Sequence, residues 1–153
     1  MSDAPQYWML VSGPENFEVS RQRGFDLAAM KSRHRKKAER VRPGDRVLFY
    51  VTGRQAFGGT ATVTGEYVED HELIWKGKKD DDYPFRFTIT PDVILQPDQF
   101  VSALNVLDQL EYTRKWPREH WHLAFQGNVH TLPAADFDTI ESALRGALPA
   151  TVR

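Results

Sequence analysis

The chain has 153 residues, a formal net charge of -1 and a hydrophobic fraction of 41%, which is the size and composition of one compact domain. It contains no cysteine, so disulfides, thiolate metal sites and cysteine nucleophiles are excluded. No stretch approaches the roughly 20 apolar residues of a membrane span, and the first residues do not resemble a secretory signal. We therefore expect a single domain over residues 1–153, monomeric, cytoplasmic and without a membrane partner.

The small net charge hides an uneven distribution along the chain. Residues 1–54 carry 11 Lys or Arg and 6 Asp or Glu, whereas residues 55–153 carry 9 and 15. Seven of the twelve residues from Lys31 to Arg42 are basic. Such a run can bind a polyanion, or it can simply be the solvated face of a helix. The sequence leaves both interpretations open.

The first third of the chain predicts two buried strands and a helix between them. Residues 7–11 and 46–51 are short, continuous apolar runs, typical of strands that are buried on both faces. From Asp26 the composition becomes helical and continues through the basic run. The sequence RPGD at residues 42–45 then predicts a turn, because proline presets one backbone angle and glycine supplies conformational freedom.

The second part predicts more strands and two helices. Polar and apolar residues alternate at 60–64 and again from Phe85 until Pro91, which is the period of a sheet with one wet face. The charged segment between these strands is expected to be a loop or a ragged hairpin. Helices are predicted to begin near Pro97 and near Pro133, and residues 121–127 can form another strand. Five or six strands without regular strand–helix alternation predict an α+β domain built around a small barrel or curled sheet.

A glycine pair stands at the entrance to one predicted strand, in the sequence QAFGGTATV at residues 55–63. Glycine weakens a strand, so it usually marks a bulge or a close approach of another group. Gly58 and Gly59 are therefore either a bend in the barrel or a wall of a binding site.

Catalytic motifs are missing from the sequence. There is no glycine-rich phosphate loop and no serine in a nucleophile elbow. His120 and His122 would share one strand face, but a metal ion needs a third ligand and none stands at a helpful spacing. The acidic residues 80–82 are flanked by lysines, which is typical of a solvated loop. We predict a protein that is not an enzyme and that has no metal and no cofactor.

Three aromatic residues lie in predicted loops, where a hydrophobic core does not obviously need them. Phe25 and Phe57 each neighbour a glycine, and Trp75 lies in the charged segment. Each can be a core residue or the wall of an aromatic cage. A cage beside a basic run would suit a base flipped out of a nucleic acid.

Five segments of the sequence are, in chain order, YWMLVSGPENF, RGF, RVRPGDRVLFYVTG, AFGGTATVTGEY and YPFRFTI. Together they resemble the EVE domain family, a branch of the PUA-like superfamily, and the resemblance spans Tyr7 to about Phe137. It implies a PUA-like twisted β-pseudobarrel of five or six strands with peripheral helices. It also implies a relation to YTH domains, which read N6-methyladenine in RNA through an aromatic cage, and an ability to bind modified bases in nucleic acid.

The resemblance implies site residues as well. Ser12 ends a strand, Asn16 follows it and Phe25 stands near the place of a cage tryptophan in the YTH pattern. Asp26 could accept a hydrogen bond from an exocyclic amino group, such as that of cytosine. The predicted pocket consists of Ser12, Asn16, Phe25, Asp26, Tyr50, Phe57, Gly58, Gly59 and Trp75. The predicted phosphate ligands are Lys31, Arg33, Arg35, Lys36, Lys37 and Arg40.

The sequence thus predicts a nucleic-acid-binding reader that takes a flipped, modified base, for example a methylated one, of DNA or RNA into an aromatic pocket. One alternative is an RNA-processing enzyme of the ASCH type, which would need an acid–base pair in the cleft. The other is a small-molecule or protein interaction domain, in which the basic run is only a solvated surface. Salt separates the last alternative from the reader, because binding to phosphates weakens as salt rises.

Overall fold

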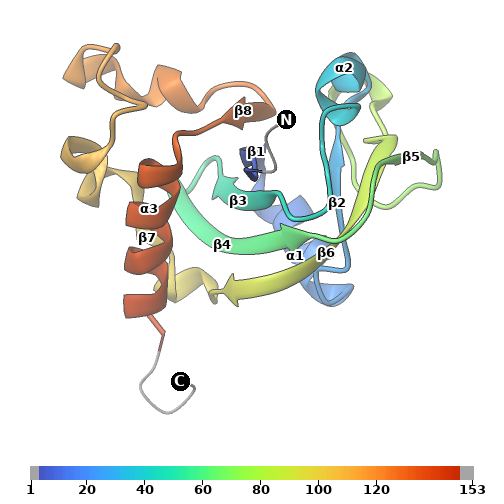
Figure 1. Cartoon of the computed structure of the whole chain (residues 1–153), viewed down its shortest axis with the longest axis horizontal. Helices are drawn as coiled ribbons and strands as arrows, with labels where there is room; N and C mark the ends of the chain where they lie inside the picture. The colour runs from blue at the N-terminus through green and yellow to red at the C-terminus, as the bar shows by residue number, and fades with distance from the viewer. Residues whose placement is uncertain (1–3, 149–153) are drawn as a thin grey trace.

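The computed structural model describes residues 4–148, which form a curled β-sheet with helices around its rim (Figure 1). Six strands follow one another in the order β2-β6-β4-β3-β1-β8, while β5 pairs with β6 and β7 pairs with β4. The strands are β1 (Tyr7–Ser12), β2 (Leu27–Met30), β3 (Arg46–Val51), β4 (Ala56–Val63), β5 (Val68–Glu69), β6 (Phe85–Ile94), β7 (Val101–Ser102) and β8 (Val129–Thr131). The predicted α+β pseudobarrel with peripheral helices is therefore confirmed.

The helical segments are mostly short and lie between the strands or after them. The α-helices are α1 (Pro14–Gln22), α2 (Arg35–Ala38) and α3 (Ala134–Gly146). The 3-10 segments are η1 (Ser32–His34), η2 (Lys78–Asp80), η3 (Pro97–Gln99), η4 (Ala103–Asn105), η5 (Leu107–Gln109) and η6 (Arg118–Phe125). In the part of the chain that the structure describes, no helix is both long and apolar enough to cross a bilayer.

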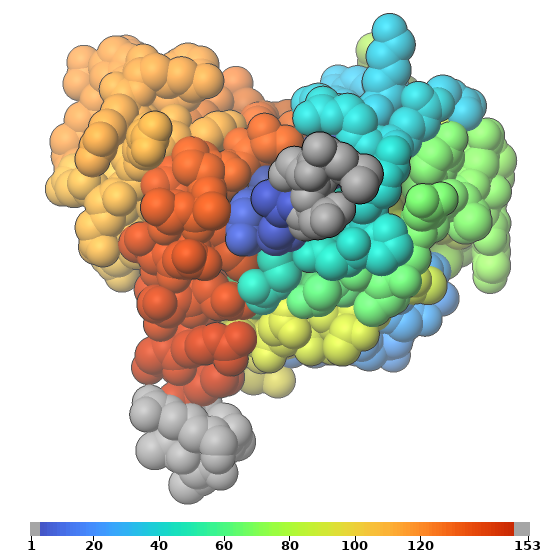
Figure 2. All heavy atoms as spheres, in the orientation of Figure 1, coloured from blue at the N-terminus to red at the C-terminus, as the bar shows by residue number. Residues whose placement is uncertain are grey.

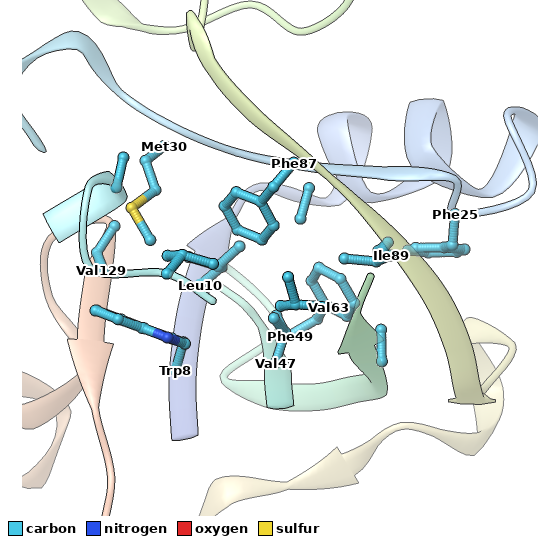
Figure 3. Close-up of a cluster of buried hydrophobic side chains, with 14 of the residues drawn as sticks. Trp8, Leu10, Phe25, Met30, Val47, Phe49, Val63, Phe87, Ile89 and Val129 are labelled. Atoms are coloured by element: carbon cyan, nitrogen blue, oxygen red, sulfur yellow. The ribbon is translucent and has the colours of Figure 1, made fainter. Parts of the chain in front are cut away.

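The sheet has a hydrophobic core on each face, as the apolar runs in β1 and β3 predict. Trp8 and Leu10 of β1 point into the curl, where they meet Phe49 and Phe87 (Figure 3). The residues between them, such as Met9, point to the opposite face, because successive side chains of a strand alternate. That second face is covered by α3 and by the 3-10 segments that precede it.

Four segments differ from the sequence prediction. Residues 27–30 form a strand, because pairing with β6 overrides their helical composition. The helix expected near Pro97 is a series of short turns around β7, and residues 118–125 form η6 instead of a strand. Strand β6 also continues past Pro91. This proline lies where the register with β4 shifts, so the backbone hydrogen bond that proline cannot donate is not needed there. The helix predicted after Pro133 is confirmed as α3.

The glycine pair forms a bulge and serves packing. The pairing of β3 with β4 shifts register here, so that Phe49 faces Gly59 and Tyr50 faces Phe57. Gly58 is the extra residue, and a Cβ on it would lie 2.7 Å from Cζ of Phe17. A Cβ on Gly59 would lie 2.5 Å from the carbonyl oxygen of Val93. Both glycines therefore let other parts of the protein approach β4, which is the barrel-bend interpretation.

The curled sheet leaves a seam between the end of β1 and the edge of β2. Strand β8 pairs with β1 from Trp8 to Leu10, one more backbone bond runs from the N–H of Val11 to the carbonyl of Asn128 at 2.9 Å, and β2 pairs with β6 alone. Asn128 bridges the seam with its side chain. Its Nδ2 donates to the carbonyl of Val11 at 3.0 Å, and its Oδ1 accepts from the backbone N–H of Lys31 at 3.1 Å. The seam is thus closed by one buried amide and not by a ladder.

Candidate functional site

A small pocket opens at this seam, with a volume of about 40 Å³. That is room for on the order of three water molecules. Its walls come from β1, α1, β2 and the segment between β5 and β6. The lining residues are Leu10, Val11, Ser12, Asn16, Phe17, Ser20, Leu27, Ala28, Ala29, Phe49, Trp75, Tyr83 and Asn128. Three of the predicted site residues, Ser12, Asn16 and Trp75, are brought together here.

Ser12 presents an unused hydroxyl to the pocket. It is the last residue of β1, and its backbone pairs with Val51 of β3. Among residues 4–148 its side chain has no hydrogen-bond partner. A hydroxyl can donate one hydrogen bond and accept two. Ser12 can therefore bind a ligand without giving up any contact of the fold.

Asn16 holds the segment that carries Trp75. Proline at the start of α1 and Gly13 before it turn the chain directly after Ser12, so Asn16 stands in the first turn. Its Nδ2 donates to the carbonyl of Lys76 at 2.8 Å, and its Oδ1 accepts from the N–H of Lys76 at 3.2 Å. The side-chain amide thus imitates a strand partner for one residue of the loop.

Two aromatic rings form one wall of the pocket. Trp75 is 5% exposed, and its Nε1 donates to the hydroxyl of Ser20 at 3.0 Å. The ring of Tyr83 lies 6.3 Å from that of Trp75, edge to face. The guanidinium of Arg86 lies 5.4 Å from the Trp75 ring centre. Tyr83 has a φ of 53°, a conformation that costs a non-glycine residue about 1–3 kcal/mol and therefore must be held by its surroundings.

Tyr83 is a pocket residue that the sequence reasoning did not identify. Its position in the sequence could have indicated this role, because Tyr83 is the aromatic residue that ends the charged segment and precedes Pro84. Its left-handed backbone turns the chain from the loop into β6. Burial raises the pKa of the Tyr83 phenol, so its hydroxyl stays protonated at neutral pH.

The free edge of β2 supplies backbone groups to the pocket. Asp26 and Ala28 direct their N–H and C=O groups toward β6, as the bond from Ile89 N–H to the Asp26 carbonyl shows. Alternate residues of a strand point these groups to opposite sides, so Leu27 and Ala29 direct theirs toward the seam. Within the described chain, no backbone hydrogen bond across the seam reaches Leu27 or Ala29. The pocket wall thus presents N–H donors and C=O acceptors of β2 that have no backbone partner across the seam.

Three predicted aromatic wall residues lie in the cores and do not line the pocket. Phe25 packs 5.1 Å from Phe17, behind the pocket wall. Tyr50 and Phe57 lie on the opposite face of the sheet, where both contact Phe125. The reason is strand alternation, which places Tyr50 on the face opposite to Phe49.

The remaining predicted pocket residues also lie elsewhere. Asp26 is exposed and forms an ion pair with Arg23 at 3.1 Å. Its side chain faces solvent and does not line the pocket. The glycine pair is covered by Phe17, Phe100 and the β6 backbone, as described above. Neither glycine borders the pocket.

The predicted phosphate ligands cluster on η1, α2 and the residues beside them. Arg35 and Arg40 are already engaged with protein groups, Arg35 with Glu69 at 3.2 Å and Arg40 over the Trp8 ring. Arg33 donates to the ring of His34. Lys31 lies closest to the pocket by its contacts, because its backbone binds Asn128 and its Nζ is 5.7 Å from the Tyr83 ring centre. Lys36 and Lys37 complete the basic surface on α2.

The electrostatics of this region are strongly positive. Burial, together with Lys37, Arg33 and Lys31, lowers the pKa of His34 to about 4. The imidazole is therefore neutral at pH 7, and an anion placed here would be favoured. The residues that the structure describes contain no group of three or more His, Cys, Asp or Glu side chains that could hold a metal ion.

The model of the EVE domain family matches residues 6–143 of this chain. The chain belongs to the EVE domain family. Among its relatives, UPF0310 protein PH1033 of Pyrococcus horikoshii is 25% identical over 150 residues, which cover 90% of this EVE domain and 98% of the relative.

Solved structures share the fold of this EVE domain. A hypothetical protein from Leishmania major superposes with a TM-score of 0.64 at 16% identity, over 95% of this chain and 98% of that one. The YTH domain of the Zygosaccharomyces rouxii MRB1 protein, in complex with N6-methyladenosine RNA, also gives a TM-score of 0.64, at 18% identity, over 94% and 87%. The likeness to the YTH fold that the sequence suggested is thus confirmed.

Proposed function

We propose that this EVE domain is a non-catalytic reader that holds a flipped, modified base of RNA or DNA in the seam pocket. The observation that carries the proposal is the composition of the pocket wall. It combines the aromatic rings of Trp75 and Tyr83 with hydrogen-bonding groups that the fold does not use, the Ser12 hydroxyl and the edge of β2. A planar ligand with polar edges matches both features.

A nucleobase has the required chemistry. Its face can stack on an aromatic ring, which is worth about 1–3 kcal/mol per base. Its edge alternates donors and acceptors, which can meet the N–H and C=O groups of Leu27 and Ala29 and the hydroxyl of Ser12. A methyl group on the base adds apolar surface, which Leu10 and Ala28 can bury.

The pocket must widen to admit a whole base, because its volume is about 40 Å³. The wall best suited to move is the segment with Trp75 and Tyr83. Side-chain contacts attach it: Asn16 with Lys76 and Ser32 with Asp81 at the surface, and further inside Trp75 with Ser20 and Arg86 with the carbonyl of Tyr83. Widening the pocket therefore breaks side-chain hydrogen bonds and leaves the strand pairing of the sheet intact.

The comparisons support the choice of ligand class. The YTH domain of the Zygosaccharomyces rouxii MRB1 protein has this fold and is in complex with an RNA that carries N6-methyladenosine. In this EVE domain the basic surface on η1 and α2 would hold the phosphates, with Lys31 nearest the pocket. Such contacts add affinity without sequence information, and they weaken as salt rises.

Substituting Ser12 by valine tests the proposal. Valine suits a strand, and its two methyl groups would occupy the pocket without breaking any contact of the fold. Ser102→Val is the matched control, since Ser102 lies on β7 and does not line the pocket. Binding is measured by fluorescence anisotropy at two salt concentrations. The probes are matched DNA and RNA oligonucleotides, unmodified or with 5-methylcytosine, 5-hydroxymethylcytosine or N6-methyladenine.

We expect one modified oligonucleotide to bind best, and Ser12→Val to weaken that binding at least tenfold with an unchanged melting temperature. Ser102→Val should bind like the wild type. Equal binding by Ser12→Val and wild type would overturn the pocket assignment. Salt-dependent binding without preference among oligonucleotides would leave only the basic surface. No binding to any oligonucleotide would favour a small-molecule or protein ligand.

A further inference from the structure

Three close contacts around His130 of β8 can all be hydrogen bonds at once only with one proton more than the neutral side chains supply. The Nε2 of His130 contacts the carbonyl of Gln126, and its Nδ1 lies 2.9 Å from the hydroxyl oxygen of Tyr112. That hydroxyl also lies 2.9 Å from the carbonyl of Ala124. Carbonyls only accept, so a hydrogen bond at each of these two contacts needs Nε2 and the hydroxyl as its donors. The contact between Nδ1 and Tyr112 is then a hydrogen bond only if Nδ1 also carries a proton.

Tyr112 supplies one of the protons that these contacts require. Burial raises the pKa of its phenol to about 12, so the hydroxyl keeps its single proton. A neutral imidazole has one N–H, and the three contacts together require three protons. The doubly protonated imidazolium of His130 would satisfy all of them.

Nearby positive charge opposes that extra proton. Lys37 of α2 donates from Nζ to the carbonyl of Val129 at 3.2 Å, directly beside His130. Lys115 has its Nζ 5.7 Å from the ring centre of Tyr112. Burial, Lys37 and Lys115 together lower the pKa of His130, while the contact with Gln126 raises it. The charged residues that act on His130 in the described chain are these two cations, and His34 of η1 lies within electrostatic range.

These groups come from both sides of a hollow in the surface. Strand β8 lies between α2 and the segment that carries η5 and η6, which is gold to orange in Figure 1, and Figure 2 shows the surface recessed between them. Lys37 comes from the first side and Lys115 from the second. Asn128, which lines the seam pocket, precedes His130 by two residues. An anion in the hollow would therefore lie beside the pocket.

We propose that His130, Lys37 and Lys115 form a phosphate subsite, and that a phosphate bound there brings a proton from solvent onto Nδ1 of His130. The anion offsets the two lysine charges, and the new N–H completes the bond to Tyr112. The assignment of this phosphate to a nucleic-acid backbone rests on the proposed function. The subsite adds His130 and Lys115 to the basic surface on α2, and it makes binding of the phosphate dependent on pH.

Uptake of this proton by His130 makes the measured affinity depend on pH. When one proton is taken up with the ligand, the association constant rises up to tenfold for each pH unit of acidification. This holds between the pKa values of His130 in the free and the bound protein. We therefore expect the affinity for an oligonucleotide to rise as the pH falls from about 8 to 6, and titration calorimetry in two buffers of different ionisation enthalpy to record the uptake.

Histidine NMR with a ligand that has no base tests the subsite directly. The His130 ring nitrogens are titrated with and without sodium tripolyphosphate at constant ionic strength. We expect the pKa of His130 to rise on adding tripolyphosphate, and the NMR signals of the exposed His122 ring to be unaffected by it. An unshifted His130, or an equal shift of both histidines, would overturn the subsite.

Two variants separate the hydrogen-bond chain from general charge. His130→Gln keeps a donor for Gln126 but cannot take up a proton, and Tyr112→Phe removes the acceptor that rewards protonation. Both should bind the oligonucleotide with nearly the same affinity at pH 6 and pH 8, whereas His122→Gln should behave like the wild type. A pH dependence that survives in both variants would contradict the proposal.

The subsite and the reader can fail separately. If tripolyphosphate shifts His130 while no oligonucleotide binds, the subsite stands and the nucleic-acid assignment of its ligand is wrong. If a modified oligonucleotide binds in the seam pocket with equal affinity at pH 6 and pH 8, the reader stands and the proton-coupled subsite is wrong.

Discussion

The seam pocket and the contact of α3 with the sheet both join distant parts of the chain through polar side chains. At α3, Glu141 accepts from Thr60 at 2.6 Å and from Arg46 at 2.5 Å, and Arg46 also reaches Asp92 at 2.9 Å. Oε2 of Glu141 is therefore engaged twice within the protein. At the seam, the hydroxyl of Ser12 and the edge of β2 are left unused. The same kinds of residue thus make a structural contact in one place and a candidate ligand site in the other.

The largest effect is expected from Phe57→Ala, on the core side of this comparison. Phe57 is fully buried, and removing a phenylalanine from a core costs about 3–5 kcal/mol of the free energy of unfolding. Urea denaturation measures that loss. The fraction that remains folded should bind oligonucleotides with wild-type affinity, because Phe57 does not line the pocket. A Phe57→Ala protein with wild-type stability and weakened binding would contradict this, because it would show that Phe57 contributes to the ligand site.

Glu141→Ala should come next, with a loss of about 2–3 kcal/mol in the free energy of unfolding. Breaking a buried ion pair costs about 3–5 kcal/mol, and the partial exposure of Arg46 lowers this value. Asp108→Ala is the control, since its pair with Arg118 is exposed and should contribute less than about 1 kcal/mol. Equal denaturation midpoints for the two variants would mean that the α3 contact is no stronger than an exposed pair.

On the seam side, Trp75→Phe should weaken binding of the preferred oligonucleotide about tenfold, which corresponds to about 1.4 kcal/mol. The smaller ring stacks less and loses the hydrogen bond to Ser20. Trp121→Phe is the matched control, because Trp121 packs on Phe125 in the other core. Fluorescence anisotropy measures both affinities. Equal affinities of Trp75→Phe and Trp121→Phe for the oligonucleotide would contradict the assignment of Trp75 to the ligand site.

The smallest effect concerns pH and His34. Its pKa is about 4 in the folded protein and 6.5 in the unfolded chain, so the unfolded state binds more protons between these values. Stability should therefore fall as the pH decreases from 6.5 to 4. His34 is half-exposed, so solvent screening keeps the loss small. His34→Gln should flatten the curve of unfolding free energy against pH over this range, and an unchanged slope would show that His34 does not cause it.

The sequence predicted the sheet better than it predicted the pocket. Continuous apolar runs identified β1 and β3, and the proline before α3 identified that helix, because these signals are local. Strand β2 has no such signal, since LAAM becomes a strand only by pairing with β6. The aromatic residues were ambiguous for a similar reason. Phe57 and Trp75 both lie beside glycine or charge in the sequence, and only the curl of the sheet decides which one borders the seam.

The position of Asn128 sets the order in which this protein can be completed during synthesis. Asn128 binds Val11, which stands 117 residues earlier, and so joins the two walls of the seam late in the chain. Contacts between such distant residues form slowly, because a long loop must close first. A nascent chain that ends before residue 128 can pair β1 with β3, but it lacks the amide that fixes the seam. Ligand binding should therefore appear abruptly in a series of ribosome-bound chains, once this asparagine has left the exit tunnel.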